Sequence, residues 1–589
     1  MSGETPTTLC AAFQRHVSRI PAETAVRTPD GSVSYTWREY GDRVRRVAAG
    51  LAALGVGRGD TVGIMLTNRP EFHVVDSAAL HLGAVPFSVY NTSAREQLSY
   101  VFGNADNPVV FCERQFVPTL REAIEGTKVE HLVSVDGEAD GAITLDELEA
   151  KVGEDFDFDA AWRTVEQGDV ATLIYTSGTT GPPKGVELTH ANLLAEVDAV
   201  TDIVPLDHTD AVISYLPDAH AANRVQCQYM SIGTGIQVIT VADPKQVIDA
   251  LTQLRPTFFA AVPQIWYKLK AKLEAALAAE HGVKKTLGTW AVETGKKVAQ
   301  LRSDGKSVPL PLKVQHTLAD KLVLAKLRSK LGMDNFRLAA SGAAPIAPDT
   351  MAFVLGLGIP VSEVWGMSEL SALVTFNPLD APRIGTVGKP VKGMELKLAE
   401  DGEILAKGPL VMRGYRKDPE KTAETVDPDG WLATGDIGTI DADGYLSIVD
   451  RKKELMINAA GKNMSPSNIE NTVKVACPLV GSVIAIGDNR KYVTALIALE
   501  PDAAAEFAEG KGITAIAPDA LAVNPEIYAE IEASVTAANE KLSRVEQIKK
   551  FTVLPTLWEP GGDELTPTMK LKRKPIAQKY QAEIEALYA

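Results

Sequence analysis

The chain has 589 residues, of which 45% are hydrophobic and 23% charged, and its formal net charge is −16. One hydrophobic core rarely serves a chain of this length, so we expect at least two domains. The acidic balance argues against nucleic-acid binding, and four scattered cysteines indicate neither a disulfide framework nor a zinc site. No signal peptide and no membrane-spanning apolar run is visible, so we expect a soluble, cytoplasmic protein.

Residues 36–54 have the pattern of an amphipathic helix. Thr36 and Glu39 form a capping box at its start, and Gly55 suits the left-handed residue that ends a helix. Helix-then-strand patterns recur at 71–89 and 247–262. This alternation predicts parallel sheets flanked by helices, an α/β architecture. The apolar stripe of the first helix, at spacings of three and four, consists of Trp37, Tyr40, Val44, Val47, Leu51 and Leu54.

Residues 175–185 read YTSGTTGPPKG and directly follow the apolar run 171–175. A strand that leads into such a loop presents backbone N–H groups and hydroxyls, and glycine lets the backbone approach a phosphate chain closely. The loop is not a Walker P-loop, because Lys184 is followed by Gly185 and the glycine spacing differs. Taken alone, the pattern fits a phosphate cradle and a flexible surface loop equally well.

Residues 284–330 are basic within an acidic chain, with eleven Lys or Arg against three acidic residues. One interpretation is a set of solvated helix faces. The other is a peripheral docking surface for anionic lipid head groups, because basic amphipathic helices lie at membrane interfaces.

The pattern becomes β-rich from about Gly385, with short apolar runs separated by Gly and Asp. A charged cluster follows at 450–454, and beyond it the chain reads as a compact α+β unit. We therefore place a domain boundary at Asp450, which divides the chain into 1–449 and 450–589.

Several further short segments have the composition of a nucleotide site. Each alone also has an ordinary structural explanation, such as a packed Trp, a turn Asp or a solvated Lys run. In chain order they are SGAAP (341–345), WGMSE (365–369), TGD (434–436), DRKKE (450–454) and LTPTMKLKR (565–573).

Together with the 175–185 loop, these motifs resemble those of the adenylate-forming superfamily of acyl-CoA synthetases and luciferases, specifically the long-chain fatty acid–CoA ligases. The resemblance covers essentially the whole chain. It implies an α/β fold with a large N-terminal domain, made of two α/β subdomains and a β-barrel. It also implies a small mobile α+β C-terminal domain that pivots at Asp450.

The resemblance assigns roles to matching residues. Lys570, Glu369 and Thr176 are the expected catalytic residues, and Glu369 and Thr176 also match the groups that hold Mg²⁺. Trp365 matches an aromatic residue that stacks on adenine, although most relatives have Tyr there. His220, Gly461 and Lys462 match the acyl and CoA site. The expected ATP- and AMP-binding residues are Thr176, Ser177, Gly178, Thr179, Thr180, Lys184, Gly342, Ala343, Trp365, Gly366, Ser368, Asp436 and Arg451.

The implied reaction has two steps. A fatty carboxylate attacks ATP to give acyl-AMP and pyrophosphate, and coenzyme A then attacks the acyl-AMP to give acyl-CoA and AMP. Two enzymatic alternatives stay open: an acyl-AMP ligase that serves a carrier protein, and a CoA ligase for a different acid. A non-catalytic nucleotide- or lipid-binding relative is the third. The sequence predicts neither the acyl chain length nor the oligomeric state.

Overall fold

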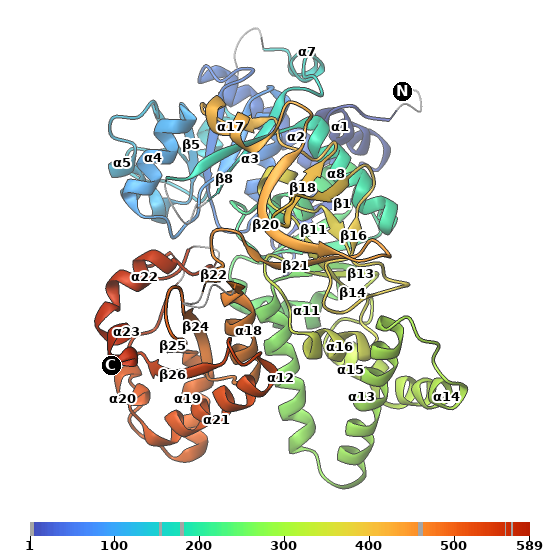
Figure 1. The fold of residues 1–589 in the computed structure, drawn as a ribbon. Coiled ribbons are helices and arrows are strands. Elements are labelled where there is room, and N and C mark those ends of the chain that lie inside the picture. Colours follow the sequence, from blue (N-terminus) through green and yellow to red (C-terminus); the bar gives the residue numbers. More distant parts are fainter. Residues whose placement is uncertain (1–4, 152–155, 177–181, 458–462, 560, 567–568) are drawn as a thin grey trace.

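A computed structural model describes residues 5–151, 156–176, 182–457, 463–559, 561–566 and 569–589. Figure 1 shows a large N-terminal domain, coloured blue to orange, with a smaller orange-red C-terminal domain beside its lower part. The mixed α/β architecture expected from the sequence is confirmed.

The first sheet of the large domain has eight strands in the order β19-β9-β8-β4-β3-β5-β6-β7. Its central pairs are parallel, whereas β8 pairs with β9 in antiparallel fashion. The strands are β3 (Thr61–Met65), β4 (Val85–Ser88), β5 (Val109–Cys112), β6 (His131–Ser134), β7 (Ile143–Thr144), β8 (Val170–Thr176), β9 (Lys184–Thr189) and β19 (Gly414–Tyr415).

The second sheet has nine strands in the order β16-β15-β14-β13-β12-β10-β11-β1-β2. All its pairs from β14 to β1 are parallel, and the pairs toward both edges are antiparallel. The strands are β1 (Thr24–Arg27), β2 (Ser34–Thr36), β10 (Ala211–Ser214), β11 (Gln237–Thr240), β12 (Phe258–Ala261), β13 (Leu338–Ser341), β14 (Val361–Trp365), β15 (Thr375–Phe376) and β16 (Lys389–Pro390).

Helices cover the two sheets, as the alternating pattern predicts. The helix expected at 36–54 is α2, whose capping box is formed as predicted: Thr36 N–H donates to Glu39 at 2.8 Å, and Glu39 N–H donates to the Thr36 hydroxyl at 3.3 Å. The helices of the large domain are α1 (Leu9–Arg19), α2 (Trp37–Ala53), α3 (Pro70–His81), α4 (Arg95–Ala105), α5 (Val117–Ala123), α6 (Leu145–Glu149), α7 (Phe158–Arg163), α8 (His190–Ile203), α9 (Ala221–Asn223), α10 (Met230–Thr234), α11 (Val247–Leu254), α12 (Pro263–Ala279), α13 (Gly282–Ser303), α14 (Leu310–Ala319), α15 (Ala325–Lys330), α16 (Pro348–Gly356) and α17 (Pro419–Thr425).

A third, antiparallel sheet has the strand order β17-β18-β20-β21. The resemblance implied a β-barrel in this domain, but these four strands form an open sheet. The outer edge of β21 bonds elsewhere: Leu446 N–H donates to the Gly388 carbonyl at 2.7 Å, and its own carbonyl accepts from Val387 N–H at 2.8 Å. The strands are β17 (Glu395–Leu398), β18 (Glu403–Lys407), β20 (Leu432–Ile440) and β21 (Leu446–Arg451).

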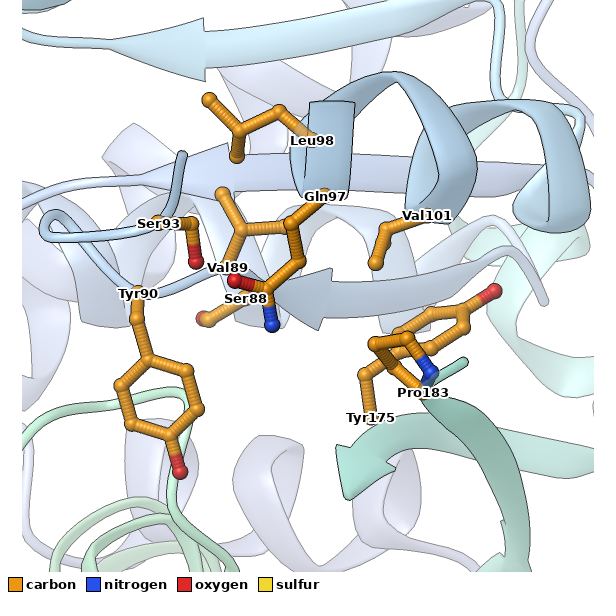
Figure 2. Close-up of a pocket in the computed structure, with 9 residues that line it drawn as sticks. All are labelled: Ser88, Val89, Tyr90, Ser93, Gln97, Leu98, Val101, Tyr175 and Pro183. Atoms are coloured by element: carbon orange, nitrogen blue, oxygen red, sulfur yellow. The ribbon is translucent and has the colours of Figure 1, made fainter. Parts of the chain in front are cut away.

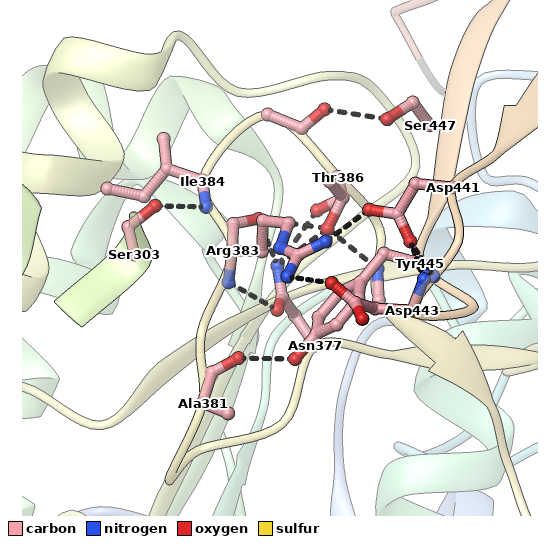
Figure 3. Close-up of polar contacts among 12 residues, drawn as sticks. Ser303, Asn377, Ala381, Arg383, Ile384, Thr386, Asp441, Asp443, Tyr445 and Ser447 are labelled. Carbon is pink, nitrogen blue, oxygen red and sulfur yellow. Dashed lines mark hydrogen bonds and ion pairs between the residues drawn. The ribbon is translucent and has the colours of Figure 1, made fainter. Parts of the chain in front are cut away.

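A polar network fixes the β20–β21 hairpin against the rest of the large domain (Figure 3). Arg383 forms ion pairs with Asp441 and, at 2.8 Å, with Asp443, and its guanidinium lies 4.1 Å from the centroid of the Tyr445 ring. The next residue, Ile384, donates its N–H to Ser303 at the end of α13 at 2.9 Å. The hairpin is therefore held at its turn, which steadies the two strands leading to Asp436 and Arg451.

The C-terminal domain has its own hydrophobic core, formed between a three-stranded sheet and its helices. Lys268 on α12 and Glu500 form a 3.3 Å ion pair between the two domains. The elements are β22 (Met456–Ile457), β23 (Asn463–Met464), β24 (Val480–Ile486), β25 (Val493–Leu499), β26 (Ile548–Val553), α18 (Pro466–Ala476), α19 (Pro501–Lys511), α20 (Pro518–Ala522), α21 (Pro525–Lys541), α22 (Arg573–Lys579) and α23 (Gln581–Tyr588).

Residues 284–330 are helical, as expected from their pattern, except for the connection at 304–309. The long helices α12 and α13 extend together from the large domain, and α14 lies at the edge of the molecule (Figure 1). A π-helical segment, η4 (Asp320–Leu324), joins α14 to α15. Within the described ranges, we find no helix whose length and apolar character would let it cross a membrane.

Candidate active site

The predicted phosphate loop connects two strands of the eight-stranded sheet. Thr176 ends β8 and is paired with Lys184, the first residue of β9, so the loop leaves and re-enters the sheet at adjacent positions. The Lys184 amine lies 4.9 Å from the centroid of the Tyr415 ring. Burial lowers the pKa of Lys184, and Lys421 lowers it further. The predicted loop residues Ser177, Gly178, Thr179 and Thr180 lie outside the described residues.

A small cavity lies beside this loop (Figure 2). It is lined by Tyr175 and Pro183 from the two ends of the loop, and by residues from the carboxyl end of β4 and from α4. The carboxyl ends of parallel strands are where ligands bind in open α/β sheets. The cavity thus lies at the ends of β4 and β8, and its volume of about 10 Å³ has room for no more than a water molecule.

Glu369 lies on a short 3₁₀ turn, η5 (Ser368–Leu370), directly after β14. The residue is only 9% exposed, and its carboxylate accepts a 2.9 Å hydrogen bond from the hydroxyl of Tyr415. The charge of Glu369 also raises the pKa of Lys184, which places the two groups close together. Tyr415 thus connects the predicted metal ligand to the predicted phosphate-binding lysine, a role that the sequence did not indicate.

The residues present fit a Mg²⁺ ion that travels with ATP. In the described part of the chain, no group of three or more His, Cys, Asp or Glu side chains could hold a metal by itself. Mg²⁺ is usually bound by one or two carboxylates together with substrate phosphates, rather than by an all-protein cage. Glu369 offers one carboxylate on Tyr415, which also contacts Lys184, and Thr176 offers a hydroxyl at the end of β8.

Close backbone packing explains the glycines of the predicted adenine pocket. A Cβ on Gly366 would lie 1.9 Å from the Ala372 carbonyl oxygen, and one on Gly342 would lie 2.8 Å from a Val364 methyl. Ala343 follows with φ of +68°, a conformation that costs an L-residue free energy. The backbone at both motifs is therefore specified tightly.

Trp365, Asp436 and Arg451 form a connected group. The indole N–H of Trp365 donates to Asp436 Oδ2 at 2.8 Å, and Arg451 Nε pairs with Asp436 Oδ1 at 2.9 Å. Asp436 and Arg451 are cross-strand partners on β20 and β21. Burial raises the pKa of Asp436, whereas Arg451 and the Trp365 hydrogen bond act in the opposite direction. A Tyr side chain has no N–H group, so a Tyr at this position could not form this N–H hydrogen bond with Asp436.

Lys570 of the C-terminal domain faces this group. The loss of hydration among neighbouring protein atoms lowers the pKa of Lys570, and repulsion from Arg451 lowers it further, while Asp436 and Glu369 raise it. Lys570 also keeps contact with solvent. These charge interactions link Lys570 to residues of both the predicted ribose group and the predicted metal group.

The charge of Lys570 also acts on His220 in the large domain. Its Nδ1 accepts the N–H of Ala222 at 3.2 Å, and desolvation together with the Lys570 charge lowers the pKa of the ring to about 4. Asp218 nearby is 5% exposed, and burial raises the pKa of its carboxyl to about 7. The ring of His220 is therefore neutral near pH 7 in this arrangement.

A buried ion pair behind this region was not predicted. Arg224, four residues after His220, pairs with Asp76 of α3, and both side chains are completely buried. The hydroxyl of Ser88 accepts a further hydrogen bond from Arg224 at 2.8 Å. No sequence pattern pointed to the pair, since its members are 148 residues apart.

Asp450 lies where the two domains meet. Its backbone is paired with Ile437 of β20, in the large domain. Its buried carboxylate accepts hydrogen bonds from the hydroxyls of Ser465 at 2.5 Å and Ser467 at 3.0 Å, at the start of α18 in the C-terminal domain. The role of Asp450 as a hinge stays a prediction. The predicted CoA-site residues Gly461 and Lys462 lie outside the described residues.

Comparisons with known proteins agree with this geometry. The chain is 35% identical to the long-chain-fatty-acid–CoA ligase FadD15 of Mycobacterium bovis, over 94% of this chain and 92% of that protein. It is 53% identical over 77% of its length to a Mycobacterium tuberculosis protein provisionally named fatty-acid–CoA ligase fadD11, of which it covers 79%. Among solved structures, the adenylation domain of a Mycobacterium chelonae carboxylate reductase superposes with a TM-score of 0.76, at 20% identity over 100% of this chain and 92% of that one.

Two family models divide the chain between them. Residues 13–416 match the model described as AMP-binding enzyme, and residues 453–589 match the model of the AMP-binding enzyme C-terminal domain. The chain therefore belongs to the AMP-binding enzyme family.

Proposed function

We propose that this chain converts a long-chain fatty acid, ATP and coenzyme A into acyl-CoA, AMP and pyrophosphate, through an acyl-AMP intermediate. The observation that carries the proposal is the hydrogen-bonded group of Trp365, Asp436 and Arg451, with which the Lys570 charge interacts. A lysine of the C-terminal domain thus interacts with the proposed nucleotide and acyl residues of the large domain. The choice of a long-chain acid rests on the names of relatives that match nearly the full chain.

In the first step, a carboxylate attacks the α-phosphorus of ATP, although both reactants are anionic. The chain's contribution is to position them and to neutralise charge. Lys570 supplies a compact positive charge between the carboxylate and the α-phosphate, while Lys184 holds the departing pyrophosphate. Asp436 and Arg451 hold the ribose. Mg²⁺, bound by Glu369 and Thr176, would reduce the repulsion between the phosphates and the incoming carboxylate.

In the second step, the thiol of coenzyme A attacks the acyl carbonyl and AMP leaves. Lys570 then stands in the way of the thiol, which is a physical reason for placing it on a separate domain. Rotation at Asp450 would withdraw Lys570 and bring Gly461 and Lys462 to the acyl-AMP. Asp450 suits a pivot because its backbone belongs to a strand of the large domain, while its carboxylate holds the first turn of α18.

The proposal is tested by measuring AMP release with a series of fatty acids, from short to very long, and with aromatic acids, in each case with and without free coenzyme A. We expect release that depends on coenzyme A and is greatest with long chains. Adenylate that accumulates whether or not coenzyme A is present would instead indicate an enzyme that serves a carrier protein. Turnover of aromatic acids alone would indicate a CoA ligase for a different acid.

We further propose a cytoplasmic protein that contacts the membrane peripherally through residues 284–330. Long-chain fatty acids partition into bilayers, so such a contact would bring the enzyme to its substrate. The basic character of the segment supports this proposal.

A further inference from the structure

Helix α14 and the π-helical segment η4 carry an unpartnered apolar ridge. Leu310, Val314, Leu318 and Leu322 follow one another at intervals of four, and their side chains are 74%, 54%, 49% and 47% exposed. Residues four apart lie on one face of a helix. Of the thirteen large apolar side chains that are strongly exposed in the described ranges, these four form one continuous row.

The opposite side of the same segment is fixed to the protein. Ala319 and Leu324 are completely buried in the core beneath the nine-stranded sheet. Arg328 of α15 donates to Asp320 at 2.7 Å and to the Leu357 carbonyl at 2.6 Å, which ties η4 to the end of α16. The outward direction of the ridge is therefore set by packing on its inner side. The ridge is therefore the outer face of a helix that is anchored at its C-terminal end.

Positive charge accompanies the ridge. Residues 306–330 contain six Lys or Arg and a single acidic residue, Asp320, which Arg328 neutralises. Lys313 and Lys321 are exposed, and neither forms an ion pair with any residue that the structure describes. Exposed leucines are not expected on a helix face that contacts only water. This excess of lysines is not expected on a helix that binds another protein. An apolar face flanked by unpaired cations matches the interface of an anionic bilayer.

We propose that α14 and η4 form a membrane-docking element, in which the Leu310–Leu322 ridge enters the acyl boundary of an anionic bilayer while Lys313 and Lys321 contact lipid phosphates. This inference rests on the membrane contact in the proposed function and assigns it to one helix face. The position of α14 at the edge of the molecule, away from the C-terminal domain, leaves that domain free to move during docking (Figure 1).

The proposal is tested by flotation of the full chain with vesicles of phosphatidylglycerol and phosphatidylcholine, and with vesicles of phosphatidylcholine alone. We expect binding to the anionic vesicles that weakens at high salt. Each lysine near an anionic surface contributes about fivefold to binding, so Lys313→Ser with Lys321→Ser should weaken it about 25-fold. Val314→Ser with Leu318→Ser should weaken it at least about tenfold, because two apolar side chains no longer enter the bilayer.

The matched control replaces two apolar residues elsewhere that are at least as exposed as the ridge pair. Ile516→Ser with Val523→Ser, at positions 61% and 79% exposed in the C-terminal domain, should bind vesicles like the unaltered chain. Flotation that is absent from the unaltered chain, or equal for ridge and control variants, overturns the proposal. So does a ridge variant that loses self-association on size exclusion while keeping its flotation, because the ridge would then be covered by a second copy.

Activity is measured in parallel with octanoate in solution, without vesicles. We expect the ridge and lysine variants to retain AMP release with this soluble acid. This arm separates the two proposals: activity without vesicle binding contradicts only the docking element, and vesicle binding without any fatty-acid-dependent AMP release contradicts only the proposed reaction.

Discussion

Replacing Trp365 by Phe tests whether the indole orients the ribose-binding carboxylate. The change keeps an aromatic face for adenine and removes one N–H, which donates to Asp436 at 2.8 Å. A hydrogen bond to a charged group contributes about 1.5–3 kcal/mol. Arg451 still holds the other carboxylate oxygen at 2.9 Å, so we expect the lower end of this range. About 1.5 kcal/mol corresponds to roughly a tenfold weaker interaction with ATP.

The assay is fatty-acid-dependent exchange of pyrophosphate into ATP, run with ATP and with 2′-deoxy-ATP. In the Trp365→Phe variant, the KM for ATP should rise about tenfold, with a smaller change in kcat. The penalty should shrink with 2′-deoxy-ATP, because that nucleotide has one hydroxyl fewer for Asp436 to accept from. Trp431→Phe is the control, since Trp431 lies before β20 and contacts Lys397 rather than the ribose group.

Two results would refute this reasoning. One is a Trp365→Phe variant whose KM for ATP equals that of the unaltered chain. The other is an equal penalty for ATP and 2′-deoxy-ATP, which would mean that the indole acts on adenine alone. The melting temperature of the variant, measured without nucleotide, checks that a raised KM does not reflect partial unfolding.

Three further predictions concern other parts of the site. Lys570→Ala should slow adenylation about 10²–10³-fold and leave thioester formation from supplied acyl-AMP nearly unchanged; equal losses in single-turnover assays of both steps would contradict its role. Gly366→Ala should lower the free energy of unfolding by about 1–3 kcal/mol, seen as a lower melting temperature, because its Cβ would meet the Ala372 carbonyl oxygen at 1.9 Å. The pKa of Asp218 is raised to about 7, so the stability that its neutral form contributes is complete below about pH 4 and lost as the pH rises through 7. Asp218→Asn keeps the hydrogen bond from Asn223, so it should melt like the unaltered chain near pH 4 and at a higher temperature near pH 8; a constant difference across this range would contradict the assignment.

Local features could be predicted from the sequence because their determinants lie within a few residues. The α2 helix is the clearest case, since Thr36, Glu39 and Gly55 all act on the ends of one helix. The strand that precedes the 175–185 loop was recognisable for the same reason. The strand order of the sheets could not be predicted. In the eight-stranded sheet, β8 pairs with β4 and β9, and β19, at residues 414–415, pairs with β9. Non-local pairing of this kind leaves no periodic signal.

The connections between site residues were also beyond local patterns. The WGMSE and TGD motifs were recognised separately, but nothing in either one indicates that Trp365 donates to Asp436 across 71 residues. Tyr415 was missed because a lone Tyr on a two-residue strand has no motif. The exposed ridge of α14 was missed as well, since an apolar residue at every fourth position reads equally well as a buried stripe. Only the packing of Ala319 and Leu324 decides which side faces outward.

The bond between Trp365 and Asp436 has a consequence for the proposed domain rotation. Both residues belong to the large domain, whereas Arg451 directly follows the proposed pivot and Lys570 lies on the rotating domain. Rotation at Asp450 would remove Lys570 from Asp436 and would shift Arg451 with the backbone. The indole N–H of Trp365 would then stay hydrogen-bonded to the Asp436 carboxylate both before and after the rotation. A Trp at this position would thus keep Asp436 oriented toward the ribose while AMP is still bound and coenzyme A attacks. If so, Trp365→Phe should slow the thioester step from acyl-AMP at least as much as it weakens ATP binding, which single-turnover measurements of both steps can decide.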